Sequence, residues 1–376
     1  MPKVLKNNHK TALRTVMLVA GEASGDALGA EILAALKHRH PTARFVGVGG
    51  PRMVAAGLES AFDYNELAVM GLWEVLPKIP LVLRRVRQLA ALAEAENVDA
   101  VITIDAQDFS KRLATQIKKK NKSIKCLHVV APTVWAWRKG RIASYARVFD
   151  HLFCLFPFEE KLFKNSGLNC TFVGHPAVQR LAPFVSKIKE KQWVALLPGS
   201  RAGEITRHWP LVRDAFLELA KSIKGLHGIL PVPEGVTLTD IPPAIEVVSG
   251  TQRFEKIGKC SAAMAKSGTS NLELAILGVP MVVFYTMHPI TYAIAKNWVK
   301  IPYMSPVNWL LEKQAVPELL QAQVTAKCLA EQTLKILSQN EAEMLQTPHL
   351  ARAVQMLKKP HMGEIVAQTI EKYVNK

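Results

Sequence analysis

The chain has 376 residues, 49% of them hydrophobic and 21% charged, so it has ample apolar material for buried cores and is not disordered as a whole. At roughly 150 residues per domain, this length predicts two domains or three. The 48 Lys and Arg residues outnumber the 31 Asp and Glu residues, and the net charge of +17 predicts an anionic partner: nucleic acid, anionic lipid or a phosphorylated substrate.

Cysteine usage and apolar runs indicate the compartment. The five cysteines form no C-x-x-C pair, which argues against a zinc ribbon and a disulfide framework and favours a reducing, cytoplasmic compartment. The longest apolar stretch, Leu272–Met287, is interrupted by Glu273 and Gly278, so it predicts a helix, a turn and a strand in place of a membrane span. No long apolar segment follows the basic amino terminus, so no signal peptide is expected.

Short apolar runs alternate with amphipathic helices along the first half of the chain. Thr15–Ala20 has the pattern of a buried strand, and the helix after it carries Leu28, Ile32 and Leu36 on one face. Further strands are expected at Arg44–Val48, Ala100–Ile104, Lys125–Val130, His151–Phe156 and Thr171–Val173. This series predicts a parallel sheet with helices on both faces and a ligand edge at the carboxyl ends of its strands.

A second series of the same kind follows a polar stretch, Ser186–Gln192, that has the composition of a linker. Its strands are expected at Trp193–Leu197, Gly228–Val232, Ile245–Val248, Ser261–Ala265 and Pro280–Tyr285, and helices fill the chain from about Val324 to Val374. We therefore expect an α/β protein with two doubly wound Rossmann-like domains, residues 1–185 and 186–345, facing a cleft. The C-terminal helices, residues 346–376, are expected to pack back on the N-terminal domain.

The turn after the first strand, Gly21–Asp26, contains two glycines that permit a tight turn and close approach of a ligand. Ser24 and Asp26 are suited to cap the following helix. Glu22 has no evident structural role at the end of a strand, so we interpret it as a site residue.

An acidic residue also follows the strand Ala100–Ile104. A carboxylate at this place, Asp105, is suited to accept a proton from an attacking hydroxyl group, and we interpret it as a general base. The alternative is that it caps the next helix, a role that we assign to Asp108.

Two turns of the second series favour a phosphate group. The first, Leu197–Arg201, ends in Ser200 and Arg201, where free N–H groups at a helix start and a guanidinium both suit an anion. The second places Ser267, Gly268 and Thr269 before another helix, with Glu273 one turn later to accept hydrogen bonds from ribose hydroxyls. The alternative for this turn is an ordinary capping box of Ser270 with Glu273.

Cofactor motifs are missing from the sequence. The chain has no complete G-x-G-x-x-G, no Walker A sequence and no D-x-D triplet, so we expect neither a dinucleotide cofactor nor a metal-bridged nucleotide diphosphate. His128, His175 and His208 have no metal-ligand spacing, and we interpret them as structural residues.

Two segments combine aromatic or apolar residues with basic ones. Trp135 and Trp137 precede Arg138, an arrangement that suits an amphipathic or anionic ligand, a single-stranded nucleic acid, or two core rings. The segment Val69–Leu83 precedes Arg84 and Arg85, which suits a membrane interface or a core helix with a solvated basic end. For the membrane alternative, the contact residues would be Val69, Met70, Leu72, Trp73, Leu76, Arg84 and Arg85.

Six motifs in fixed order resemble those of the lipid-A-disaccharide synthases, inverting glycosyltransferases of the two-Rossmann GT-B architecture. They are Val19–Asp26, Leu67–Gly71, Ile104–Ala106, Val134–Arg138, Phe172–Pro176 and Leu197–Arg201. The likeness runs from about Thr15 to Leu320. It implies transfer of 2,3-diacylglucosamine from UDP-2,3-diacylglucosamine to 2,3-diacylglucosamine 1-phosphate, giving the β-1,6-linked lipid A disaccharide 1-phosphate and UDP. It also implies a cytoplasmic enzyme bound peripherally to the anionic surface of the inner membrane, and a homodimer.

The resemblance implies roles for individual residues. Asp105 matches the general base that acts on the acceptor 6-hydroxyl, and Arg201 matches the arginine at the UDP diphosphate. Other matches are Glu22 and Ser24 in the first loop, and Ser200, Ser267, Gly268, Thr269, Glu273 and Asn308 on the donor side. The family usually reads Asp-Ala-Pro-Asp-Phe-Asn at the base, whereas here Gln107 replaces the proline and Ser110 the asparagine, so we expect the rigidity of this loop to differ.

Two rival functions are weighed against this one. Another two-Rossmann sugar-nucleotide enzyme, such as a different glycosyltransferase or a UDP-sugar epimerase, shares the phosphate features but has no use for an exposed apolar segment. A basic nucleic-acid-binding protein fits the charge, but the chain carries no recognised nucleic-acid motif, so we expect no nucleic-acid partner.

Overall fold

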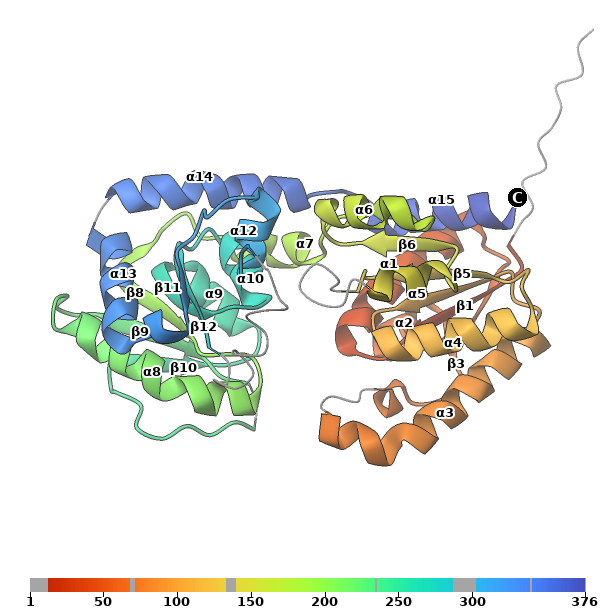
Figure 1. The fold of residues 1–376 in the computed structure, drawn as a ribbon, viewed down its shortest axis with the longest axis horizontal. Coiled ribbons are helices and arrows are strands. Elements are labelled where there is room, and N and C mark those ends of the chain that lie inside the picture. The colour runs from red at the N-terminus through yellow and green to blue at the C-terminus, as the bar shows by residue number, and fades with distance from the viewer. Residues whose placement is uncertain are drawn as a thin grey trace, which may run out of the picture. The chain divides into compact units, whose positions relative to one another are not determined.

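The computed structural model describes residues 13–67, 72–132, 140–233, 235–286, 302–338 and 340–375. Within this part, the backbone but not the side chains is described for residues 72–78 and 340–345. The chain forms two compact units: the first comprises the residues up to His175 together with those from Lys359 onward, and the second is Pro176–Lys358. Each unit is built on one parallel sheet (Figure 1).

The sheet of the first unit has the strand order β3-β2-β1-β4-β5-β6-β7, and all of its pairs are parallel. Its strands are β1 (Thr15–Ala20), β2 (Arg44–Val48), β3 (Glu59–Ser60), β4 (Ala100–Ile104), β5 (Lys125–Val129), β6 (His151–Cys154) and β7 (Asn169–Phe172). Its helices are α1 (Ala23–Arg39), α2 (Pro51–Ala56), α3 (Leu72–Ala95), α4 (Gln107–Lys120), α5 (Gly140–Ala146), α6 (Pro157–Phe163) and α15 (Met362–Val374).

Helices cover both faces of this sheet because successive side chains of a strand point to opposite faces. Met17 and Val19 of β1 lie in the same apolar core as α3 and α4, which contribute Leu89 and Leu113. The intervening residues of β1 lie in a second core with α1 and α15, to which Ile32 belongs. A strand that is apolar on both faces is therefore needed at this place, as the continuous apolar run of Thr15–Ala20 indicates.

The sheet of the second unit has the order β10-β9-β8-β11-β12-β13 and is also parallel. Its strands are β8 (Glu190–Leu197), β9 (His227–Pro231), β10 (Ile245–Val248), β11 (Cys260–Lys266), β12 (Met281–Tyr285) and β13 (Glu318–Leu320). Its helices are α7 (Ala177–Leu181), α8 (Ala202–Ala220), α9 (Gln252–Gly258), α10 (Ser270–Ile276), α12 (Pro306–Leu311), α13 (Ala326–Ser338) and α14 (Asn340–Leu357).

The two predicted doubly wound sheets are confirmed, with differences at two edge strands and at the linker. The edge strands β3 and β13 were not predicted, because two or three residues carry no usable periodicity. The predicted linker Ser186–Gln192 is wrong at its end, where Glu190 begins β8 and pairs with Cys260 of β11. The segment Leu272–Met287 contains the end of a helix, a turn and a strand, as expected.

The last helix, α15, returns to the first unit and lies beside α1, although the two are more than 300 residues apart in sequence (Figure 1). Arg39 on α1 donates two hydrogen bonds to the Glu371 carboxylate, of 2.6 and 2.8 Å. Gly363 lies so close to α1 that a Cβ atom there would be 2.6 Å from the backbone oxygen of Glu31. The small residue at this position is therefore a requirement of close helix packing.

We predict that Gly363→Ala lowers the thermal midpoint of the first unit, because the new methyl group must push α15 away from the backbone of α1, at a cost of about 1–3 kcal/mol. Thermal unfolding followed by circular dichroism measures the effect. Gly203→Ala is the matched control, since Gly203 is also the second residue of its helix but faces open space. Equal midpoints for the two variants would contradict the packing argument.

Candidate functional site

The site residues of the first unit lie where its strand order changes direction. Strands β2 and β3 lie on one side of β1, and β4 to β7 lie on the other. Ala20 pairs with Ile104, so β1 and β4 end at the same level and their loops leave the sheet as neighbours. A Cβ atom at Gly21 would lie 3.5 Å from the Cβ atom of Ala106. Glu22 and Asp105 are thus on adjoining loops at a topological switch point, the usual ligand edge of such sheets.

The backbone at Asp105 is held in an unusual conformation. Asp105 has a φ angle of 54° and Ala106 one of 44°, in the left-handed region that residues other than glycine rarely occupy. The Asp105 N–H donates to the Val129 oxygen at 3.0 Å, and the Asp105 oxygen accepts a 2.7 Å hydrogen bond from Ser110 Oγ. Backbone strain of this kind is found preferentially at functional sites, where the surrounding structure maintains it.

The Asp105 carboxyl group has a raised pKa. Burial raises it, and this effect outweighs hydrogen bonds from the Ala106 N–H and the Gln107 side chain, both of which lower the pKa. A carboxylate with a raised pKa is a stronger base than an exposed aspartate, which suits proton abstraction. A partly buried carboxyl group with a raised pKa at this edge of the sheet is chemically able to act as a base.

The capping roles that we expected nearby are wrong. The carboxylate of Asp26 does not cap α1; it accepts hydrogen bonds of 3.0 Å from the N–H groups of Arg52 and Met53, at the start of α2. Asp108 does not cap α4, but is exposed and paired with Arg141. Sequence spacing placed each aspartate at a helix start without showing which helix lies within its reach. Ser24 is exposed, and Glu22 is the residue that precedes α1.

The second unit repeats this arrangement between β8 and β11. Leu197 pairs with Ala265, so the turn after β8 and the turn after β11 leave the sheet as neighbours. Arg201 precedes α8, and its side chain is 73% exposed. Ser200 beside it is exposed as well. The start of α8 therefore presents a guanidinium and free backbone N–H groups to solvent, a combination that suits a phosphate.

An ion pair connects these two turns. Lys266, the last residue of β11, donates from Nζ to Oε1 of Glu204 at 2.8 Å, and Oε2 of Glu204 accepts from the Ser200 N–H at 3.2 Å. Burial raises the pKa of Glu204, but the hydrogen bonds from Lys266 and Ser200 outweigh burial, so the pKa is lowered. Glu204 thus holds the turn of Ser200 and Arg201 in place and keeps the Lys266 ammonium beside it.

In the turn before α10, Ser267 and Gly268 make hydrogen bonds within the protein, whereas the surface at Gly268 and Thr269 is open. Ser267 donates from Oγ to the Met304 oxygen at 2.6 Å, and the Gly268 N–H donates to the buried Asn271 side chain. A side chain at Gly268 would meet open space, and Thr269 is exposed. The alternative capping box is wrong, because no side chain caps α10.

Glu273, one turn into α10, accepts a 2.8 Å hydrogen bond from Arg180. Burial raises the pKa of Glu273, in opposition to the attraction of Arg253 and Arg180, which lowers it. This glutamate is therefore a partly buried acceptor beside the turn.

Asn308 has a different role from the one the resemblance implied. Its side chain is fully buried, and its Oδ1 accepts from the N–H groups of Ala315 and Val316. Its Nδ2 donates to the Val316 oxygen and to Glu318. Because both of its donors and its oxygen are already used, Asn308 holds the α12–β13 loop rather than offering a free amide to a ligand.

The expected membrane segment is described in part. In α3, Val86 and Leu89 lie in the core, whereas Arg84 is exposed and Ile79 is 40% exposed. Arg85 donates two hydrogen bonds, of 2.8 and 2.7 Å, to Glu66, so it is not a free surface cation. Val69 and Met70 lie outside the described residues, as do the side chains of Leu72, Trp73 and Leu76. Trp135, Trp137, Arg138 and Lys139 lie outside them as well.

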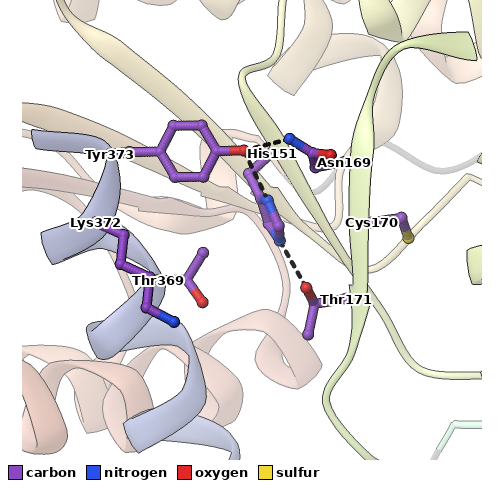
Figure 2. A pocket seen from close by; sticks show the side chains of 7 residues that line it. All are labelled: His151, Asn169, Cys170, Thr171, Thr369, Lys372 and Tyr373. Carbon is purple, nitrogen blue, oxygen red and sulfur yellow. Dashed lines mark hydrogen bonds between the residues drawn. The ribbon is translucent and has the colours of Figure 1, made fainter. Parts of the chain in front are cut away.

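A cavity of about 430 Å³ lies at the opposite edge of the first sheet, between α15 and the strands β6 and β7 (Figure 2). Its His151 bonds Tyr373 at 3.1 Å and Thr171 at 3.0 Å, and Asn169 donates to Tyr373. Burial lowers the pKa of His151 to about 4, so the ring is neutral at neutral pH. Since His151 begins β6, this cavity lies at the amino ends of the strands. The hydrogen bonds of Tyr373 to His151 and Asn169 attach α15 to the sheet.

Three residues with contacts at the site were not predicted from the sequence: Lys266, Glu204 and Gln107. In the sequence, Lys266 and Glu204 lie beside the predicted phosphate turns, which could have marked them as site residues. Only the pairing of β8 with β11 brings the two side chains together. Among the described residues, no cluster of three His, Cys, Asp or Glu side chains is arranged to hold a metal ion. No helix in the same part of the chain is long and apolar enough to cross a membrane.

A family model and two relatives in sequence describe the same enzyme. A model of the lipid-A-disaccharide synthetase family matches residues 16–369. A lipid-A-disaccharide synthase of Pseudomonas putida (strain W619) is 40% identical over 330 residues, covering 84% of this chain and 88% of the relative. One of Rhodospirillum centenum is 37% identical over 348 residues, covering 88% of this chain and 87% of the relative.

Solved structures share the fold at much lower sequence identity. A UDP-N-acetylglucosamine 2-epimerase from Methanocaldococcus jannaschii, in complex with UDP-GlcNAc and UDP, has a TM-score of 0.61 and 12% identity, with 94% of this chain and 99% of that chain covered. The glycosyltransferase of kitacinnamycin has a TM-score of 0.60 and 15% identity, with 96% of this chain and 99% of that chain covered. These likenesses establish the GT-B fold and leave the reaction to the sequence relatives.

Proposed function

The chain belongs to the lipid-A-disaccharide synthase family, and on that premise we propose which of its residues carry the reaction. The protein is a glycosyltransferase of lipid A biosynthesis. It transfers 2,3-diacylglucosamine from UDP-2,3-diacylglucosamine to 2,3-diacylglucosamine 1-phosphate. The products are the β-1,6-linked disaccharide 1-phosphate and UDP. The observation that carries this conclusion is the match of the family over residues 16–369.

Asp105 is the general base in this proposal. Its carboxylate accepts the proton of the acceptor 6-hydroxyl while that oxygen attacks the anomeric carbon of the donor. The bond from that carbon to the UDP diphosphate breaks, the electron pair leaves with UDP, and the configuration inverts. The raised pKa and the constrained loop support this role. Base assistance of this kind typically contributes about 10²–10⁴ in rate.

The turns after β8 and β11 bind UDP in this proposal. Arg201 and Lys266 supply positive charge for the diphosphate, which gains negative charge as the glycosidic bond breaks. The starts of α8 and α10 supply backbone N–H groups, and Ser200, Ser267, Gly268 and Thr269 line them. Glu273, beside the second turn, accepts from the ribose hydroxyls in this proposal. Asn308 acts indirectly, by holding the loop that ends in β13.

The first half of α3 contacts the anionic surface of the inner membrane in this proposal. Ile79 is partly exposed, and Arg84 and Arg87 on the same helix are exposed, so this helix offers an apolar group and cations to the surface. Such a surface binds the interface of anionic lipids, where acylated substrates reside. The homodimer that the resemblance implies stays a prediction, which analytical ultracentrifugation of the full chain tests.

We predict that Asp105→Asn retains UDP binding and loses turnover, because the amide cannot accept the proton of the hydroxyl group. The assay measures UDP and disaccharide formed by purified protein from the donor and the acceptor, with and without EDTA. In the wild type, we expect UDP release that requires the acceptor and persists in EDTA. Retained turnover in Asp105→Asn would exclude this residue as the base. Absence of a disaccharide from folded wild-type protein in detergent would exclude the proposed reaction.

We predict that Lys266→Met weakens UDP binding about five- to tenfold and leaves uridine binding unchanged, since only the diphosphate uses the ammonium group. Isothermal titration calorimetry gives both affinities. Lys221→Met is the matched control, because Lys221 follows the other end of α8 and also pairs with a glutamate, Glu218. Equal losses for UDP and uridine would instead indicate that Lys266 only supports the local structure.

We predict that Ile79→Asp reduces co-sedimentation with vesicles of phosphatidylglycerol and phosphatidylethanolamine, because the charge opposes insertion of this part of α3 into an anionic interface. Ile188→Asp is the control, since Ile188 is a more exposed isoleucine in the other unit, at 74%. Equal binding of the two variants would place the membrane contact elsewhere.

A further inference from the structure

The side chain of Gln107 connects the loop of Asp105 to the neighbouring strand and helix. Its Nε2 donates to the Val130 oxygen at 2.9 Å, beyond the end of β5. Its Oε1 lies 2.6 Å from the Tyr145 hydroxyl on α5 and 3.1 Å from Nε2 of His128 on β5. The same side chain lowers the pKa of the Asp105 carboxyl group.

The direction of each hydrogen bond follows from the chemistry of its partners. Burial raises the pKa of Tyr145 and lowers that of His128 to about 3, so the first is a neutral phenol and the second a neutral imidazole. Both groups therefore donate to the Gln107 oxygen, which can only accept. Nε2 of Gln107 then donates to the Val130 oxygen. Nδ1 of His128 accepts in turn from the Thr103 hydroxyl at 2.8 Å.

Gln107 lies among three strained backbone positions. In addition to Asp105 and Ala106, Val130 has a positive φ angle of 78°, a genuine outlier for a β-branched residue. The hydrogen bond from Gln107 to the Val130 oxygen joins the strained end of β5 to the strained end of β4. Strain of this kind persists only where surrounding contacts determine it, and Gln107 supplies the side-chain contact between the two loops.

We propose that Gln107 is a positioning residue for the reaction, which holds the Asp105 carboxylate in place through a buried network of Tyr145, His128 and Thr103. The proposal rests on Asp105 being the base of the proposed function. Because the amide oxygen accepts from Tyr145 and His128 and the amide nitrogen donates to Val130, the side chain cannot flip without leaving buried partners unpaired. The Gln107 side chain, two residues after Asp105, is therefore fixed before substrate binds.

The network also sets where the base titrates. Donation from Gln107 stabilises the ionised carboxylate and so lowers its pKa, in opposition to burial. Loss of this donor moves the pKa of Asp105 further up, and the ionised base is then lost at higher pH. The titratable groups on adjoining elements are Glu22 on the first loop, Asp108 with its partner Arg141, and the neutral His128 and Tyr145.

The test is the pH dependence of turnover by Gln107→Met, which keeps the length of the side chain and removes its hydrogen bonds. We expect the acid limb of kcat to move up by about one pH unit and kcat at its plateau to fall about tenfold, with KM for the donor unchanged within about twofold. Tyr145→Phe, which removes one donor to Gln107, should shift the acid limb in the same direction by a smaller amount.

Thr115→Val is the matched control, because it removes another side-chain hydrogen bond on α4 that does not reach Asp105. Thermal unfolding of each variant gives the folded fraction. An unmoved acid limb in folded Gln107→Met, or the same shift in Thr115→Val, overturns the proposal. Should Gln107→Met not fold, an unmoved limb in Tyr145→Phe overturns it equally. Retained turnover in Asp105→Asn is a separate result, since it removes the base assignment itself.

Discussion

In a parallel sheet, the loops that follow the strands all lie at one edge. Where the strand order reverses, the loops after two neighbouring strands run in opposite directions, and a space for a ligand opens between them. Both sheets of this protein reverse beside their first strand in sequence, at β1 and β4 and at β8 and β11. Because crossovers are right-handed, helices cover both faces of a parallel sheet only when the strand order reverses. The positions of Glu22, Asp105, Ser200, Arg201 and Lys266 all depend on this constraint.

In the proposed reaction, the two units use that shared geometry for different chemistry. In the first unit, the loop after β4 carries a carboxylate whose pKa burial raises, and the backbone of this loop has positive φ angles at Asp105 and Ala106. In the second unit, the turns carry cations and helix starts, and Glu204 holds Lys266 beside Ser200. A base needs a constrained, partly desolvated group, whereas a leaving diphosphate needs positive charge, so the same fold meets two electrostatic demands.

The loop of Asp105 shows how a substituted motif is supported by its surroundings. The resemblance led us to expect altered rigidity at Gln107 and Ser110, which stand where the family usually has proline and asparagine. In this structure both side chains tie the loop down: Ser110 bonds the Asp105 oxygen, and Gln107 bonds the end of β5. Rigidity that a proline ring supplies through its own covalent geometry is supplied here by hydrogen bonds.

The sequence by itself determined the two doubly wound sheets, most of their strands, the family, and the placement of Asp105 and Arg201 after strand ends, because these follow from local periodicity and from contiguous motifs. The tertiary structure alone decided the rest. Asp26 caps α2, Arg85 is paired with Glu66, Asn308 is fully occupied, and Lys266 meets Glu204. Gln107 likewise meets Tyr145 and His128 only because α5 and β5 pack beside its loop. Each of these contacts joins side chains that are distant in sequence or whose orientation periodicity does not encode, and hydrogen bonds depend on distances and angles that only the packed chain defines.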